Sequence, residues 1–216
     1  MNPKKSFDDP FDFIQRTRAG EKEVLNLCKA GALTSIHPNA PHLQLLTKVY
    51  FKNQKKTILS EFVTSDVTLE PYNDYQKIIN EMEILDFAVT AHPLTLFKEH
   101  IDWSNIVSSN ELEIHSNQII RFCGWLVTSR RVPTSGNQFM KFLTLEDFYG
   151  LCEAVLFPAV YVKYGHLVRT HGPYLVTGKV QSRLPGEANL IVDKLEIVSM
   201  GKDEIEGLLQ KTTKNQ

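Results

Sequence analysis

Apolar residues in the first half of the chain recur at the three- and four-residue steps that are typical of an amphipathic helix. Val24, Leu25 and Cys28 fall on one face of a segment from 21 to 29, and a longer stripe marks residues 74–89. Shorter helices are expected over residues 12–18, 42–51 and 94–100. This half of the chain is therefore predicted to be helical.

The pattern changes near residue 118, where β-branched and aromatic residues dominate short segments. Strands are expected over 119–131, 138–145, 151–157, 173–181 and 188–198, with a helix over 158–168 between the third and fourth strands. Three strands, a helix and two strands is the order of an OB-fold, a five-stranded Greek-key barrel. Gly124 inside the first strand is expected to mark the bulge or tight bend that a small barrel needs. The predicted fold class is α+β, with N-terminal helical segments followed by this barrel.

The elements divide the chain into four regions. These are a helical segment at 1–60, a linker and helices at 61–116, an OB-fold domain at 117–200 and a flexible tail at 201–216. Residues 61–72 show no clear period and are interpreted as a linker, and residues 102–116 as a polar connection. Asp147 is expected to stabilise the turn that ends at Gly150 through local bonds to the backbone.

The second predicted strand carries apolar residues on both faces. Leu143 and Leu145 share one parity and suit the barrel interior, whereas Met140, Phe142 and Thr144 share the other. With the leucines inside, Phe142 becomes an outer platform on which a base can stack, an interaction worth about 1–3 kcal/mol. The alternative is that Phe142 packs under a loop or against the helical half of the chain.

Basic residues end the neighbouring strand. Arg130 and Arg131 precede a loop that closes with Asn137 and Gln138. Because adjacent side chains of a strand point to opposite faces, one arginine is expected to project toward an oligonucleotide groove. There it can grip phosphate or stack on a base. A solvated strand end is the alternative, which the interleaved aromatic residues make less favourable.

Composition and charge exclude few classes of protein. The net charge is −1, but residues 117–200 hold nine basic and six acidic residues, a net +3 that leaves −4 for the rest. The sequence contains no run near the roughly 18 apolar residues that a membrane span needs, and its N-terminus lacks the apolar segment of a signal peptide. Three widely spaced cysteines predict neither a disulfide framework nor a metal site, which fits a reducing cytoplasm.

The sequence contains no recognisable catalytic motif. The P-loop, Gly-x-Gly-x-x-Gly and Gly-x-Ser-x-Gly patterns are absent. His37 and His42 are five residues apart, and no histidine pair has the i, i+4 spacing of a helical zinc site. Glu81 and Glu83 are two apart on a helix and face different ways. We therefore predict that the chain is not an enzyme and uses no cofactor or metal.

The predicted barrel carries Phe-Leu-Thr-Leu-Glu-Asp at 142–147, followed by Gly150, Glu153 and Val-Leu-Phe-Pro at 155–158. This motif resembles the OB domain in the C-terminal region of the bacterial DNA polymerase III alpha subunit. Upstream, Glu-Ile-Leu-Asp-Phe at 83–87 and Ala-His-Pro-Leu at 91–94 are similar to the stretch before that domain. Residues 25–36 are similar to the family's helix-hairpin-helix region, which leans on the duplex backbone. The resemblance thus assigns a helix-hairpin-helix-like character to 1–60.

The sequence also departs from this family. The family usually has glycine where Asp86 stands. Its magnesium-holding palm aspartates lie in domains that would precede residue 1, so we expect a chain that cannot polymerise DNA alone, either a separate piece or a fragment. The nearest counterpart of the family's sliding-clamp peptide is Gln-Leu-Leu at 44–46, without the expected aromatic spacing, and these leucines are interpreted as helix core.

The signature Phe-x-x-Leu-x-Asp-x-x-Gly at 142–150 is also similar to the anticodon-binding OB domain of class II aminoacyl-tRNA synthetases. In those proteins the phenylalanine stacks on an anticodon base, which favours Phe142 as a nucleic-acid contact. The synthetases tend to carry glutamine where Glu153 stands, and a glutamate there is expected to weaken phosphate or base contacts. The candidate nucleic-acid-binding residues are Trp125, Arg130, Arg131, Asn137, Gln138, Phe139, Lys141, Phe142, Thr144, Glu153 and Arg183.

The preferred hypothesis is a non-catalytic, cytoplasmic module that binds single-stranded DNA during DNA replication. A polymerase catalytic subunit, a sliding clamp and clamp-loader proteins are its candidate protein partners, and no membrane is expected. Two alternatives stay open, a protein-interaction adaptor of the replisome and a tRNA-binding accessory OB domain. The upstream helical segments argue against the tRNA alternative, because they match the polymerase order.

Overall fold

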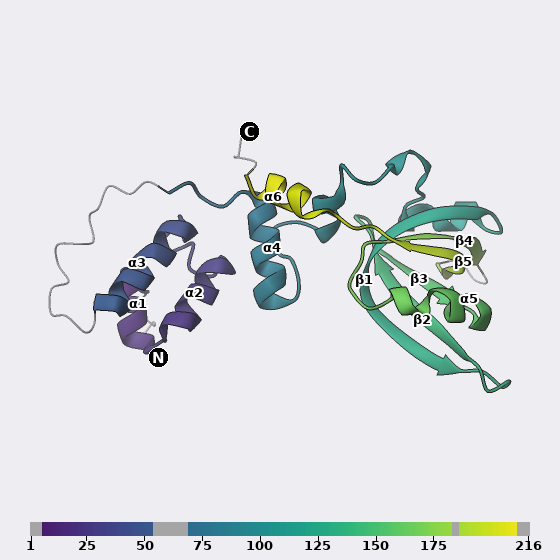
Figure 1. Ribbon diagram of the computed structural model, residues 1–216, viewed down its shortest axis with the longest axis horizontal. Helices are drawn as coiled ribbons and strands as arrows, with labels where there is room; N and C mark the ends of the chain where they lie inside the picture. The colour runs from purple at the N-terminus through teal and green to yellow at the C-terminus, as the bar shows by residue number, and fades with distance from the viewer. Residues whose placement is uncertain (1–5, 54–68, 183–185, 211–216) are drawn as a thin grey trace. The chain divides into compact units, whose positions relative to one another are not determined.

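The structure is a computed structural model that describes residues 6–53, 69–182 and 186–210 (Figure 1). The chain divides into two compact units, one formed by residues 1–91 with 206–216 and the other by residues 92–205. This division differs from the predicted boundaries, because residues 92–116 group with the barrel. Within the described ranges, no helix is both long and apolar enough to cross a bilayer.

The first unit is helical, as expected. Its helices are α1 (Pro10–Thr17), α2 (Glu21–Lys29), α3 (Ala40–Asn53) and α4 (Asp74–Leu85). Buried apolar side chains of α1, α2 and α3, with one from the turn after α2, form one cluster made of Ile14, Val24, Cys28, Leu33, Leu43 and Tyr50. Leu45 and Leu46 of the clamp-like tripeptide are half-buried on α3, and the side-chain amide of Gln44 donates to the hydroxyl of Tyr72 over 2.9 Å. The predicted linker lies mostly outside the described residues.

Helix α4 ends four residues earlier than predicted. It stops after Leu85 because Asp86 takes the left-handed backbone conformation, with φ of 62°. That conformation favours glycine, which gives a physical reason for the glycine that the resembling family usually has there. The buried carboxylate of Glu81 then holds the following loop by accepting from the backbone N–H groups of Val89 and Thr90 at 2.7 and 2.8 Å.

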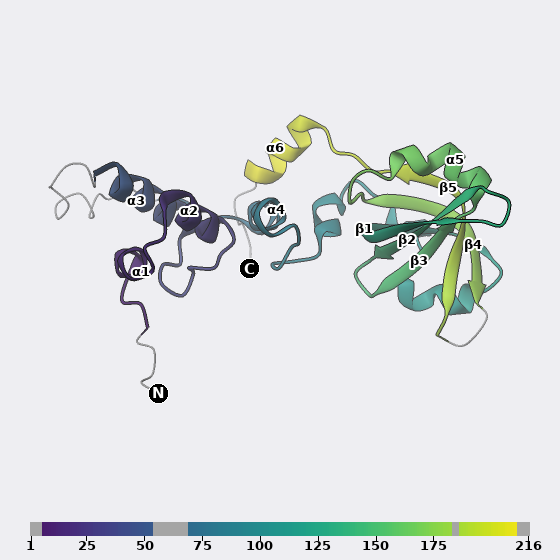
Figure 2. The ribbon, with the colours of Figure 1, turned by 90° about the horizontal axis from the view of Figure 1, so that it is seen from below.

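The second unit contains a closed five-stranded barrel (Figures 1 and 2). Its strands are β1 (Ile119–Pro133), β2 (Phe139–Glu146), β3 (Leu151–Leu156), β4 (Tyr174–Ser182) and β5 (Ala188–Ile197), in the spatial order β1-β2-β3-β5-β4. Helix α5 (Pro158–Tyr164) and the 3₁₀ turn η4 (Gly165–Leu167) connect β3 to β4. The OB-fold prediction and the α+β class are confirmed.

Strand β1 closes the barrel by pairing with β4 along residues 119–124 and with β2 from residue 125 onward. Gly124 lies at this change of partner, where an added Cβ would come within 2.7 Å of the Phe122 ring and 2.8 Å of the Leu145 Cβ. The predicted bulge is present but is not at Gly124: the register with β2 shifts between Leu126 and Thr128. The bulge therefore falls at Val127.

The barrel interior follows the predicted alternation. Leu143 and Leu145 are fully buried, together with Phe122 of β1 and Ala154 of β3. The sequence pattern left open which side of β2 is buried, and the structure places the two leucines in the core. The side chains of opposite parity on β2 therefore face outward.

A short helix was expected over residues 94–100 and a polar connection over residues 102–116, and the prediction of a polar connection is wrong. The segment contains three 3₁₀ helices, η1 (Pro93–Phe97), η2 (Trp103–Asn105) and η3 (Ser109–His115). Leu94 is fully buried and Leu112 joins the barrel core. The backbone N–H of Val107 donates to the carbonyl of Arg121 over 2.9 Å, which ties the segment to β1.

The prediction of a flexible tail is also wrong over residues 202–210, because these residues form helix α6 (Lys202–Gln210). The side-chain amide groups of Asn73 and Gln76 donate to the carbonyls of Leu208 and Leu209, at 3.3 and 2.7 Å. Leu208 is buried. These long-range contacts order a polar segment that has weak local signals.

The three cysteines give a prediction for thiol chemistry. All are free and buried, and burial raises the pKa of Cys28 to about 11 and the pKa of Cys123 and of Cys152 to about 12. At about pH 8 the folded chain should react with a disulfide reagent far more slowly than the unfolded chain, which exposes three thiols. Rapid labelling of one thiol per folded chain would contradict this burial.

Candidate nucleic-acid interface

The outer surface of three neighbouring strands forms the candidate interface, named here the outer face. Backbone pairing brings together Trp125, Thr128 and Arg130 of β1, Phe142, Thr144 and Glu146 of β2, and Glu153 and the buried Val155 of β3. The bulge at Val127 sets this arrangement, because it returns Thr128 and Arg130 to the side on which Trp125 lies. Sheets of this kind in OB-folds are the usual oligonucleotide site.

Phe142 lies near the middle of this face and is half-buried. It pairs with Arg130 on one side and with Val155 on the other. The guanidinium carbon of Arg130 stands 4.5 Å from the centre of its ring, in a cation–π contact. The side chain that covers Phe142 is thus long, charged and 66% exposed.

Arg130 has a second partner on the same face. Its Nη2 atom lies 3.6 Å from Oε2 of Glu153, and the two side chains are 66% and 36% exposed. An exposed ion pair contributes about 0–1 kcal/mol, and an exposed cation–π contact about 0.5–1 kcal/mol. Both contacts are weak enough for a ligand to displace.

Trp125 occupies the far end of the outer face but is partly covered. The ring of His171 stacks on it with 5.9 Å between the ring centres and 8° between the planes, and Phe97 stands 6.3 Å away. The carbonyl of Leu126 is 2.9 Å from Nδ1 of His171 and accepts from it when that nitrogen is protonated. Sequence reasoning missed His171, because no local pattern links it to a strand 45 residues earlier.

Three of the predicted residues lie on the opposite side of the β1–β2 hairpin. Arg131 places its guanidinium 4.4 Å from the ring centre of Phe139, which is 42% exposed, and Lys141 pairs with Arg131. The predicted set is therefore split: Arg130 shares a side with Phe142, and Arg131 shares the other with Phe139. The alternation of adjacent arginines holds, but one groove does not collect all of the candidates.

The remaining candidate residues lie at the tip of the β1–β2 hairpin or outside the described residues. Asn137 has a left-handed backbone with φ of 57°, and the carbonyl of Gln138 accepts from the backbone N–H of Thr134 at 2.8 Å. These bonds close the loop between β1 and β2. Arg183 lies outside the described residues.

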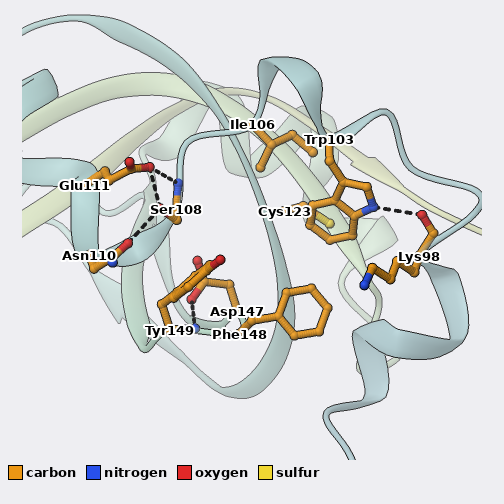
Figure 3. A pocket seen from close by; sticks show the side chains of 10 residues that line it. All are labelled: Lys98, Trp103, Ile106, Ser108, Asn110, Glu111, Cys123, Asp147, Phe148 and Tyr149. Carbon is orange, nitrogen blue, oxygen red and sulfur yellow. Dashed lines mark hydrogen bonds between the residues drawn. The ribbon is translucent and has the colours of Figure 1, made fainter. Parts of the chain in front are cut away.

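A pocket of about 530 Å³ opens beside the turn between β2 and β3 (Figure 3). The rings of Trp103 and Phe148 are 5.6 Å apart on one side, and Tyr149 lies across from them. Lys98 and Glu111 also contribute to its rim. Sequence reasoning missed this pocket, since half of it comes from the segment that was interpreted as a connection.

Asp147 holds the base of this pocket. Its buried carboxylate accepts from the backbone N–H groups of Tyr149 and Gly150, both at 2.9 Å, as the turn prediction required. It also accepts from the backbone N–H and the hydroxyl of Ser109, at 2.7 and 2.6 Å. One side chain therefore fastens both the β2–β3 turn and the start of η3.

His92 lies beside the turn, against Phe148, with 5.3 Å between the ring centres. Its Nδ1 accepts from the backbone N–H of Leu94, so the ring proton of the neutral form is on Nε2, 3.7 Å from a carboxylate oxygen of Glu146. Burial lowers the pKa of His92 despite this carboxylate. We therefore infer a neutral, structural histidine.

Comparison with known proteins agrees with the OB-fold of the barrel. Residues 120–198 match the family model described as "OB-fold nucleic acid binding domain". The DNA polymerase III subunit alpha of Halalkalibacterium halodurans is 31% identical over 222 residues, covering 98% of this chain and 20% of that protein. The error-prone DNA polymerase of Symbiobacterium thermophilum is 26% identical over 126 residues, covering 57% of this chain and 12% of that protein. The resemblance to the polymerase III alpha subunit is confirmed along nearly the whole chain.

The chain spans about a fifth or less of the length of these two relatives. Among solved structures, asparaginyl-tRNA synthetase from Pyrococcus horikoshii is 24% identical with a TM-score of 0.37, and the match covers 47% of this chain and 24% of that one.

Asp147→Ala should lower the free energy of unfolding of the barrel unit by about 2–4 kcal/mol, because it removes a buried carboxylate that accepts from four part-buried donors. Both tryptophans, Trp103 and Trp125, lie in this unit, so their fluorescence in a urea titration reports its unfolding. Asp193→Ala removes an exposed carboxylate from β5 and should change stability by less than about 0.5 kcal/mol. Equal effects of the two substitutions would refute the bracing role of Asp147.

Proposed function

We propose that this chain, related along nearly its whole length to a part of the DNA polymerase III alpha subunit, is a non-catalytic module that binds single-stranded DNA on its outer face during replication. The observation that carries the proposal is Phe142, an aromatic ring at the middle of a three-strand surface beside the exposed Arg130. Base stacking on such a ring tolerates any sequence. The OB-fold and the relatives support the same class of ligand.

Binding in this proposal exchanges partners on the outer face. Arg130 leaves the Phe142 ring, a base takes its place, and the guanidinium moves to a backbone phosphate. Thr128 and Thr144, which pair across β1 and β2, present hydroxyl groups beside the bound strand. Their neutral hydrogen-bonding capacity suits a strand of mixed sequence.

The low net charge of −1 predicts weak binding by this chain alone. In the cell, we propose, a larger cytoplasmic assembly supplies the remaining affinity. A polymerase catalytic subunit, a sliding clamp or a clamp loader would be its protein component. The pocket beside Trp103 and Phe148, with Tyr149 exposed at its edge, is the surface that favours a protein contact. Co-purification of the full chain with a polymerase catalytic subunit, with and without Tyr149→Ala, tests this part.

Phe142→Ala should weaken binding of a labelled single-stranded oligonucleotide of mixed sequence by about fivefold or more, because it removes a stacking platform. Fluorescence anisotropy at low salt measures the affinity, which should fall as salt is added. Tryptophan fluorescence confirms that the variant stays folded.

Phe139→Ala is the matched control, since this ring also lies under an arginine but on the other side of the hairpin. It should change the affinity by less than about twofold if the outer face holds the strand. No binding by the unaltered chain at low salt would refute the proposed function. A larger loss with Phe139→Ala than with Phe142→Ala would move the site to the opposite side.

A further inference from the structure

Glu153 places a carboxylate on the outer face, which is proposed to bind a polyanion. Its position determines which groups of a bound strand it can contact. It lies on β3, beside Thr144 of β2 and beside Asn189 of β5. Its side chain is 36% exposed, so it is partly screened from water yet open to a ligand. A carboxylate accepts hydrogen bonds only, and the nature of the group that approaches it therefore matters.

The distance from Glu153 to the stacking ring suits contact with the edge of one base. Phe142 pairs with Val155, and Glu153 is two residues along the same strand, on the same face. Such diagonal neighbours lie about 7–8 Å apart, within reach of a long side chain. A base centred on the Phe142 ring would extend its hydrogen-bonding edge over this interval.

In the free chain, Arg130 links the two positions, standing over Phe142 and 3.6 Å from the Glu153 carboxylate. A base that replaces Arg130 on the ring also removes the partner of Glu153. The stacked base would also shield the Glu153 carboxylate from water, and a shielded carboxylate without a donor costs free energy. A base that brings its own donor avoids this cost, and a base that brings an acceptor adds repulsion to it.

We propose that Glu153 gives the outer face a base preference by accepting a hydrogen bond from the exocyclic amino group of the base stacked on Phe142. This inference rests on the proposed function. Cytosine, adenine and guanine carry such an amino group, whereas thymine and uracil present carbonyl oxygens in its place. The imino group of thymine lies between two carbonyl oxygens, so a carboxylate that approaches it meets repulsion on both sides. The outer face therefore discriminates against thymine and uracil.

The test compares oligo(dC) with oligo(dT) of equal length, both fluorescently labelled, in anisotropy titrations with the full chain at slightly alkaline pH. These two pyrimidines differ chiefly in the amino group and the carbonyl at the edge that Glu153 would read. We expect oligo(dC) to bind about fivefold more tightly than oligo(dT), the lower end of what one good base contact contributes.

Glu153→Gln keeps the shape of the side chain and supplies a donor as well as an acceptor. It should bring the affinity ratio of the two oligonucleotides close to one, mainly by strengthening oligo(dT) binding. Asp193→Asn is the control, because it makes the same change of charge at an exposed position on β5. It should raise both affinities slightly and leave their ratio unchanged.

Equal affinity of the unaltered chain for the two oligonucleotides, or an unchanged ratio in Glu153→Gln, would overturn the base preference while the proposed function stands. Absence of binding to both oligonucleotides at low salt would overturn the proposed function, and this inference with it. The ratio of the oligo(dC) and oligo(dT) affinities of the unaltered chain tests the base preference even if the Glu153→Gln variant fails to fold.

Discussion

A one-residue bulge in β1 decides which side chains share the outer face of the barrel. Residues of a strand alternate between inside and outside, so one extra residue exchanges the two sets for the rest of the strand. The extra residue is Val127, and beyond it Arg130 faces the same side as Phe142. Without the bulge, Arg131 would take that place. The contact of Arg130 with both Phe142 and Glu153 depends on this local irregularity.

The sequence predicts the parts of the fold that have a strong local pattern. The order of strands and helix along the chain follows from the β-branched and aromatic segments, and the turn bonds of Asp147 follow from the chemistry of aspartate before glycine. The inward position of Leu143 and Leu145 required the structure, because both sides of β2 carry apolar residues. The end of α4 was missed, because a left-handed aspartate such as Asp86 has a weaker signal than glycine. Helix α6 was missed, because distant contacts of its last turn with Asn73 and Gln76 help to hold it.

The candidate site, too, could be predicted from the sequence only in part. Its residue types were predictable, but their distribution over two sides of the hairpin required the register. Phe139 and Phe142 look equivalent in sequence, yet each has its own arginine and its own side. The stacking of His171 on Trp125 joins segments that only barrel closure brings together. The outer face places one arginine beside one carboxylate. If this face binds nucleic acid as proposed, the pairing favours weak and exchangeable binding.

The central claim is that the outer face, and not the opposite side of the hairpin, holds a single strand. Carbon-13 labelling of the phenylalanine rings allows Phe142 and Phe139 to be followed separately by NMR, with assignment from the two alanine variants. As single-stranded DNA is added, the Phe142 ring signals should shift strongly, because a stacked base places a ring current over them, while the Phe139 signals stay in place. Shifts confined to Phe139, or no shift of either ring in the presence of bound DNA, would contradict the account.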